Sequence, residues 1–204
     1  MAEPRFISFE GVDGAGKTTQ IARLAERLRA AGREVVATRE PGGAPGAEAI
    51  RRLLVEGEPG RWSPETECLL FTAARRDHLE RTIEPALARG ATVLCDRFAD
   101  STRVYQGAAR AELRATVDAL HRLMIGREPD LTLVLDLDPA AAHARGLARG
   151  GVEDRFERLG PGFQARLRAG FLALAAEFPD RCRVIPADGP PEAVAARIDA
   201  ALAA

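Results

Sequence analysis

Short apolar runs alternate with longer amphipathic segments along this chain. The apolar runs predict five strands, at residues 5–10, 33–38, 92–96, 131–137 and 182–186. Between them, apolar residues recur at helical spacing and predict helices at residues 19–31, 47–55, 64–89, 112–125, 139–148, 162–177 and 191–202. The almost uniformly apolar run from Leu131 to Leu137 is typical of a strand buried on both faces of a parallel sheet. The alternation therefore predicts an α/β fold, a five-stranded parallel sheet with helices on both faces.

One stretch between the first strand and the first helix has a specific spacing. Residues 11–18 (GVDGAGKT) match GxxxxGK[ST], the pattern of a phosphate-binding loop. Glycines allow consecutive backbone N–H groups to point at phosphate oxygens, and the following helix adds its positive end. Lys17 can then reach the β and γ phosphates, and the Thr18 hydroxyl can ligate Mg²⁺. The alternative, an ordinary glycine-rich turn, does not explain why Lys17 is the only lysine among the 29 lysines and arginines.

Composition narrows the class of protein. A length of 204 residues, with 46% hydrophobic and 29% charged residues, suits one soluble globular domain. The formal net charge of −1 gives no reason to expect nucleic acid or a membrane as a partner. Three cysteines without a CxxC pair argue against a disulfide framework or a zinc site. The first strand leaves no room for a signal peptide and no apolar run reaches the length of a membrane span, so we expect a cytoplasmic enzyme.

A phosphate loop indicates nucleotide binding but not the reaction. GTPase switches read guanine with an asparagine-containing motif, and this chain contains no asparagine. Motor proteins and DNA-dependent ATPases usually need a longer chain. A small P-loop kinase remains, with arginines in several loops to hold two phosphate-bearing substrates.

Four further motifs make the sequence specific. They are TREPGG at residues 38–43, FTAAR at 71–75, DRF at 96–98 followed by STRVYQG at 101–107, and DRFE at 154–157. With the phosphate loop, they occur in the order found in bacterial thymidylate kinases, which the chain resembles over nearly its whole length. The resemblance implies one P-loop nucleoside monophosphate kinase domain over residues 1–204, with a short lid at about 145–160 and a homodimeric assembly. It also implies transfer of the γ-phosphoryl group of ATP to dTMP, giving dTDP and ADP for DNA precursor synthesis.

Two alternatives remain open. The same scaffold could serve a kinase of another nucleoside monophosphate or small metabolite. A nucleotide-binding regulatory module with little turnover is the alternative from another class, although such a module has no use for acceptor-side residues.

The resemblance assigns ATP to the phosphate loop and to one lid arginine. The implied ATP-binding residues are Gly11, Val12, Asp13, Gly14, Ala15, Gly16, Lys17, Thr18, Thr19 and Arg145. Thr18 and Asp96 would lie near Mg²⁺, since Asp96 ends an apolar strand where a P-loop protein places a metal carboxylate. A capping role is the plain alternative for Asp96, and Asp136 and Asp138 are rival candidates because they also end a strand.

The acceptor would be bound by a second group of residues. The implied dTMP-binding residues are Asp13, Arg39, Phe71, Arg75, Arg97, Ser101, Thr102 and Tyr105. Arg39 and Arg97 would clamp the monophosphate, because a guanidinium gives two parallel hydrogen bonds to phosphate oxygens. Tyr105 would close against the sugar and leave no room for a 2′-hydroxyl, and Asp13 would lie near the 3′-hydroxyl. For either arginine alone, a solvated surface charge is the plain alternative.

Phe71 and Arg75 would read the base. Four residues apart, they share one face of a helix. By similarity to the family, Phe71 stacks on thymine and Arg75 bonds a carbonyl at the base edge, where Ser101 and Thr102 also lie. Core packing is the alternative for Phe71.

The implied catalytic residues are Lys17, Arg97, Arg149 and Arg155. The family places a catalytic arginine either in the phosphate loop or in the lid. Because Ala15 stands in the loop here, the resemblance implies a lid arginine, first Arg149 and then Arg155, with Gly150 and Gly151 as hinges. The alternative for any one of these arginines is a solvated charged loop.

Overall fold

The structure is a computed structural model that describes residues 5–58, 60–109, 112–148 and 161–203. Its centre is a five-stranded sheet in the order β2-β3-β1-β4-β5, in which every neighbouring pair is parallel. The strands are β1 (Phe6–Glu10), β2 (Val35–Arg39), β3 (Thr92–Asp96), β4 (Leu131–Asp136) and β5 (Cys182–Pro186). The predicted α/β class and the five parallel strands are confirmed.

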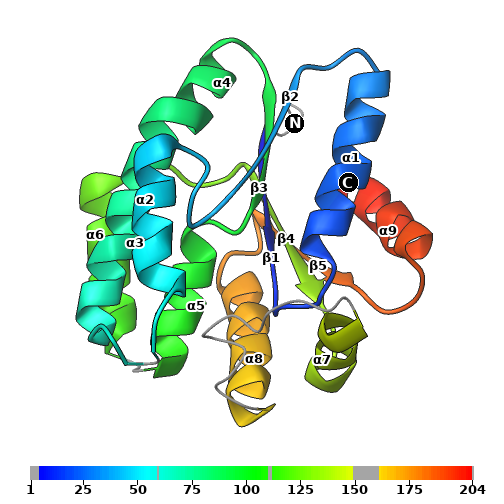
Figure 1. Ribbon diagram of the computed structural model, residues 1–204. Helices are drawn as coiled ribbons and strands as arrows, with labels where there is room; N and C mark the ends of the chain where they lie inside the picture. Colours follow the sequence, from blue (N-terminus) through cyan, green and yellow to red (C-terminus); the bar gives the residue numbers. More distant parts are fainter. Residues whose placement is uncertain (1–4, 59, 110–111, 149–160, 204) are drawn as a thin grey trace.

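Helices cover both faces of this sheet, as predicted (Figure 1). Their bounds are α1 (Lys17–Ala30), α2 (Pro45–Val55), α3 (Pro64–His78), α4 (Glu84–Ala88), α5 (Ala99–Ala109), α6 (Leu113–Met124), α7 (Pro139–Ala148), α8 (Pro161–Glu177) and α9 (Pro191–Ala203). In Figure 1, α1 and α9 lie together on one side of the sheet, and α2 to α6 lie on the other. Within the described residues, no helix has both the length and the apolar character needed to cross a membrane.

Alternation along β3 divides its side chains between two apolar clusters. On β3, Leu94 belongs to the larger apolar cluster, which joins the sheet to α1, α8 and α9. Its neighbours Val93 and Cys95 belong to a smaller cluster, formed with the residues at the end of the α3–α4 segment. Successive strand residues point to opposite faces, so β3 is buried on both sides.

Two segments differ from the sequence-based expectation. The single helix predicted at 64–89 is divided by a π-helical turn, η1 (Leu79–Ile83), between α3 and α4. Pro85 follows this turn, and because proline has no N–H it cannot continue an α-helical ladder. The polar stretch after Asp96, for which no helix was predicted, forms α5. Its polar residues Ser101, Thr102, Arg103 and Gln106 are buried, which removes the amphipathic pattern that would have revealed the helix.

The carboxyl ends of three strands meet at one edge of the sheet. Asp96 of β3 is in register with Arg39 of β2 and with Phe9 of β1. The phosphate loop follows β1 at this edge, and the predicted site residues of β2 and β3 stand beside it. Open α/β proteins bind their ligands at this carboxyl edge.

Candidate active site

A cavity of about 300 Å³ opens at this edge. Thirteen of the residues predicted from the sequence line it: Asp13, Gly14, Gly16, Lys17, Thr18, Arg39, Phe71, Arg75, Asp96, Arg97, Ser101, Thr102 and Tyr105. Five lining residues were not predicted: Glu40, Pro41, Arg51, Val55 and Phe98. The remaining loop residues Gly11, Val12, Ala15 and Thr19 are not among those that line it. Phosphate-loop and acceptor-side candidates therefore share one cavity.

Glycines of the phosphate loop stand where no side chain could. Gly14 has φ +84°, and a Cβ there would lie 2.2 Å from the carbonyl oxygen of Ala142. A Cβ on Gly11, at φ +130°, would lie 2.5 Å from the carbonyl oxygen of Leu135. The loop is thus held tightly against the backbone of β4 and α7.

Lys17 begins α1 and is almost fully buried. Its Nζ donates to the carbonyl oxygens of Gly11 at 3.1 Å and Val12 at 2.9 Å. Burial, and then the nearby Arg97, lower the pKa of Lys17 to about 8, while neighbouring carboxylates oppose this shift. The ammonium is therefore held beside the loop by neutral carbonyls, which an anionic phosphate oxygen can replace.

The two predicted metal ligands are in contact. Thr18 Oγ1 donates to Asp96 Oδ2 at 2.7 Å. The rival carboxylates have other partners, because Asp136 accepts a hydrogen bond from Arg168 at 2.6 Å and Asp138 caps the start of α7 through the backbone N–H of Ala140. Of the three candidates, Asp96 alone lines the cavity.

Arg97 is the centre of the acceptor-side charges. It has a positive φ of 70°, which is uncommon for a residue with a side chain. Its guanidinium donates to Asp13, to Ser101 Oγ at 2.9 Å and to the Tyr105 hydroxyl at 3.2 Å. The Tyr105 hydroxyl in turn donates to Asp13 Oδ2 at 3.1 Å.

The pKa values of Asp13 and Arg97 are shifted in the direction that the charges around them favour. Burial would raise the pKa of Asp13, but Arg97 and then Lys17 outweigh it and lower that pKa to about 2. Burial would likewise lower the pKa of Arg97, but Asp13 and the other acidic neighbours raise it above its usual value. Asp13 is thus ionised and Arg97 charged at neutral pH.

Glu10 supports the site from behind the cavity, a role that the sequence analysis missed. This fully buried carboxylate at the end of β1 accepts from the backbone N–H of Phe98 at 2.8 Å and from Ser101 Oγ at 2.5 Å. Burial, and then the negative Asp100, raise the pKa of Glu10 to about 7, although Arg97 opposes the shift. It fixes the turn that carries Arg97. An acidic residue that ends an otherwise apolar strand was the signal that could have revealed it.

Helices α3 and α5 form the side of the cavity where the base was predicted to bind. Phe71 and Arg75 both line the cavity from α3, as predicted from their spacing. Arg75 is buried, and its Nη2 donates to Thr102 Oγ1 at 2.9 Å. Arg39 lies at the rim, where its exposed guanidinium pairs with Glu48 at 2.9 Å.

The comparisons with known proteins agree with this geometry. The sequence model of the thymidylate kinase family matches residues 9–198. The chain belongs to the thymidylate kinase family. Its fold and class of enzyme, a nucleoside monophosphate kinase, are those predicted.

Similar thymidylate kinases cover almost the whole chain. The thymidylate kinase of Dinoroseobacter shibae is 67% identical over 203 residues, covering 99% of this chain and 98% of that protein. That of Caulobacter vibrioides is 59% identical, covering 97% of this chain and 95% of the relative. The crystal structure of the thymidylate kinase from Ehrlichia chaffeensis has a TM-score of 0.79 at 34% identity and covers 97% of each chain.

Of the lid predicted at about residues 145–160, the structure describes only residues 145–148. Arg145, at the end of α7, donates to the carbonyl oxygens of Ala187 at 3.0 Å and Gly189 at 3.2 Å. It does not line the cavity. Arg149 and Arg155, predicted as catalytic, lie outside the described residues.

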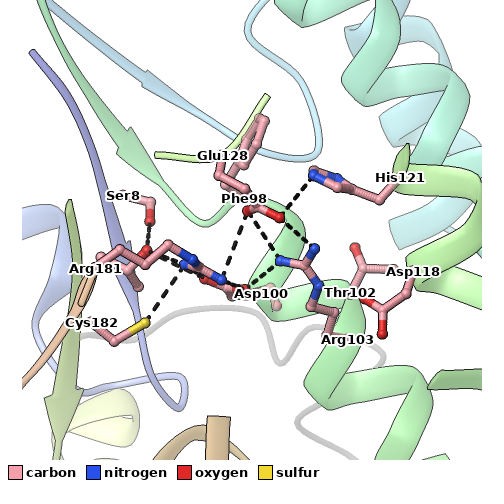
Figure 2. A network of polar contacts seen from close by, with 12 residues as sticks. Ser8, Phe98, Asp100, Thr102, Arg103, Asp118, His121, Glu128, Arg181 and Cys182 are labelled. Atoms are coloured by element: carbon pink, nitrogen blue, oxygen red, sulfur yellow. Dashed lines mark hydrogen bonds and ion pairs between the residues drawn. The ribbon is translucent and has the colours of Figure 1, made fainter. Parts of the chain in front are cut away.

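The opposite side of α5 anchors this wall of the candidate site to the sheet (Figure 2). Asp100 accepts from Arg103 at 2.7 Å and from Arg181, just before β5, at 2.5 Å. Arg103 also pairs with Asp118 of α6 at 2.8 Å and with Glu128 at 2.6 Å. Figure 2 shows the two guanidinium groups on either side of Asp100. The helix that supplies Ser101, Thr102 and Tyr105 is therefore fixed by buried ion pairs.

Proposed function

We propose that this thymidylate kinase family member transfers the γ-phosphoryl group of ATP to dTMP inside the cavity described above. One observation carries the proposal. The phosphate-loop lysine and the acceptor-side residues Arg97, Phe71, Arg75 and Tyr105 line the same cavity. Two nucleotides bound there would meet with their phosphates between Lys17 and Arg97.

ATP would bind through the phosphate loop. The loop amides and the start of α1 suit phosphate oxygens, and Lys17 would leave the carbonyls of Gly11 and Val12 to contact the β and γ phosphates. The hydroxyl of Thr18 and the carboxylate of Asp96 are hard oxygen ligands, which fit Mg²⁺. When bound, the ion neutralises negative charge on the phosphates. The described residues hold no cluster of three or more acidic, histidine or cysteine ligands, so phosphate and water oxygens would complete its coordination.

dTMP would occupy the other side of the cavity. Arg97 and Arg39 would bind its phosphate, and the Asp13–Tyr105 pair would lie along the sugar. Phe71 would stack on the base and Arg75 would donate to a base carbonyl, beside Thr102. Arg51 also lines the cavity and adds a positive charge near the acceptor.

The reaction then needs alignment more than proton transfer. An anionic oxygen of the dTMP phosphate attacks the γ-phosphorus of ATP, a new P–O bond forms, and the bond to the β–γ bridging oxygen breaks to release ADP. Because the nucleophile is already ionised, no strong general base is required. Lys17 and Arg97 would hold the two polyanions in line and neutralise charge on the transferred group.

Several finer assignments stay predictions. They include a single domain over residues 1–204, a lid at about 145–160 and a transition-state arginine at Arg149 or Arg155. Homodimeric assembly, a cytoplasmic location and the absence of nucleic acid or membrane partners do too.

The decisive experiment is an acceptor panel with ATP and Mg²⁺. Steady-state rates with dTMP, dUMP, dCMP, AMP and shikimate should show a clear preference for dTMP. Preference for another acceptor would support the alternative kinase, and absence of ADP formation with every acceptor would support a regulatory module. In the same assay Lys17→Ala should lose orders of magnitude in turnover while its circular dichroism stays unchanged. Near-normal turnover of a folded Lys17→Ala protein would contradict the proposed role of the phosphate loop in catalysis.

A further inference from the structure

Half of the TREPGG motif does not face the cavity. Arg39, Glu40 and Pro41 line it, but Thr38 and Gly43 do not. Thr38 and Gly43, together with the carboxylate of Glu40, surround one side chain outside the motif, His78 at the end of α3. His78 is fully buried and has no part in the proposed chemistry.

The contacts of His78 form a directed chain. Its Nδ1 lies 3.0 Å from Glu40 Oε1, and its Nε2 lies 2.7 Å from Thr38 Oγ1. An ionised carboxylate only accepts hydrogen bonds, so Nδ1 is assigned the hydrogen and Nε2 faces the threonine hydroxyl. Gly43 makes this packing possible. At φ +82°, a Cβ on Gly43 would lie 2.4 Å from both His78 Nε2 and Thr38 Oγ1.

The second oxygen of Glu40 carries the chain to the cavity. Glu40 Oε2 accepts from Arg75 Nε at 2.7 Å, and both side chains are only 4% exposed. On its other side, Arg75 donates through Nη2 to Thr102 Oγ1 at 2.9 Å. The guanidinium is planar, so two fixed nitrogen atoms also fix the direction of its remaining N–H groups.

A fixed guanidinium distinguishes two classes of pyrimidine. It can donate hydrogen bonds but cannot accept one. Thymine presents a carbonyl oxygen at position 4, whereas cytosine presents an amino group, a donor. A donor that cannot turn away leaves the cytosine amino group unpaired in a buried site, and such mismatches are strongly rejected.

We propose that Glu40 and His78 are positioning residues that hold Arg75 as a fixed donor and thereby set the preference for a 4-oxopyrimidine over a 4-aminopyrimidine acceptor. This inference rests on the proposed function, in which Arg75 reads the base. Thr38 and Gly43 complete the support behind it.

The test compares kcat and KM of the full chain for dTMP and dCMP at saturating ATP. Glu40→Gln should lower the ratio of kcat/KM for dTMP to that for dCMP by about tenfold or more, mainly through a higher KM for dTMP. His78→Leu should lower the ratio in the same direction, and His78→Asn, which keeps a donor for Glu40, should restore part of it. The matched control is Glu80→Gln, which removes an exposed carboxylate from its pair with Arg76 just beyond α3 and should leave both constants unchanged.

A double variant separates positioning from general loosening. Arg75→Ala should itself lower the dTMP/dCMP ratio, and adding Glu40→Gln should then lower it no further, because both changes act through one guanidinium. Additive losses would overturn the inference, as would an unchanged ratio in Glu40→Gln and His78→Leu beside a lowered ratio in Arg75→Ala. In that second case the proposed function would stand. An unchanged ratio in Arg75→Ala would overturn both the base-reading role and the inference. If Glu40→Gln does not fold, the dTMP/dCMP ratio of kcat/KM is measured for His78→Leu, His78→Asn and Thr38→Val instead. An unchanged ratio in all three would overturn the inference.

Discussion

Arg97 lies just before α5 and Arg103 lies six positions further on, within this helix, yet the two side chains have different surroundings. Their side chains are 15% and 5% exposed. Among the described residues, Arg97 forms an ion pair with Asp13 alone, and its other donors go to hydroxyls. Arg103 forms ion pairs with three carboxylates, those of Asp100, Asp118 and Glu128 (Figure 2).

Arg97 and Arg103 differ in the number of carboxylates that contact them. They do not differ in the direction of their pKa shifts. Burial would lower both arginine pKa values, and acidic neighbours raise both above the usual value. The charge of Arg103 is more than balanced by acids and is turned away from the cavity, so this arginine anchors α5. Arg97 lines the cavity with one acid beside it and can accept a further anion. A strongly shifted pKa therefore marks a functional residue only where a cavity reaches it.

The largest effect that the comparison predicts is on catalysis. Arg97→Met should lower kcat/KM for dTMP by about a hundredfold to a thousandfold, because one preorganised charge at the transferred phosphate is lost. The urea midpoint of Arg97→Met should change less than that of Arg103→Met. Without Arg97, Asp13 still has two partners, Lys17 at 3.8 Å and the Tyr105 hydroxyl. Steady-state kinetics and urea unfolding of the same preparation measure both quantities. If the folded Arg97→Met enzyme had a normal kcat/KM, the acceptor phosphate would not bind at Arg97.

Arg103→Met should show the reverse pattern. Removing one partner from a buried ion network typically costs about 3 kcal/mol or more in the free energy of unfolding. The low end of that range is expected, because Asp100 keeps Arg181, Asp118 keeps Arg114 and Glu128 keeps His121. The kcat of the folded fraction should stay close to that of the unmodified chain.

Arg114→Met is the control for this variant. Arg114 pairs with Asp118 at 2.8 Å and with the exposed Glu177, but its side chain is 28% exposed and its loss should cost under about 1 kcal/mol. Equal destabilisation by the two substitutions would show that the buried network is no stronger than a surface pair.

Glu10 is influenced by Asp100, a partner of Arg103, and by Arg97. The pH dependence of stability therefore tests the charges around both arginines. The pKa of Glu10 is raised from 4.5 to about 7, first by burial and then by Asp100, so the folded state keeps a proton that the unfolded chain loses above pH 4.5. This contribution to stability is complete below pH 4.5 and is lost as pH rises towards 7. Urea unfolding at pH 5 and pH 7 should show a decline on the order of 2 kcal/mol that is absent in Glu10→Gln, which cannot ionise. An equal decline in Glu10→Gln would assign it to other groups.

Local patterns were enough to predict the sheet and the phosphate loop, whereas the acceptor-side residues of the cavity came from the resemblance to thymidylate kinases. Each strand is a short apolar run, and a phosphate loop is defined by glycine spacing over eight residues. Arg39 ends β2 and Arg97 follows β3, so both line the cavity at the carboxyl edge of the sheet, whereas Arg75 reaches the same cavity from α3.

Buried polar partners could not be predicted in the same way. Glu10 and His78 are far in sequence from the carboxylate or hydroxyl that they contact, and so are Arg103 and Glu128. Periodicity also treats a buried charged residue as an exposed one. For the same reason α5 was not predicted, since its inward side carries charges where a helical pattern needs apolar residues. Hydrophobic periodicity alone distinguishes neither Arg97 from Arg103 nor a site from its anchor, and only the resemblance to the family assigned a role to Arg97.

Tyr105 offers the smallest and sharpest test of the Arg97 side. Its hydroxyl contacts Arg97 and Asp13, and its ring packs edge-on against Phe163 and Phe171 at centroid distances of 6.3 and 6.4 Å. Tyr105→Phe keeps the ring and removes only the hydroxyl, so kcat/KM for dTMP should fall by about fivefold to tenfold, the value of one hydrogen bond. The fall should be the same for the ribonucleotide of thymine, because the ring rather than the hydroxyl is proposed to exclude the 2′-hydroxyl group. If Tyr105→Phe instead accepts the ribonucleotide as well as dTMP, the sugar is read by the hydroxyl and its two charged partners, and Arg97 then serves specificity as well as phosphate binding.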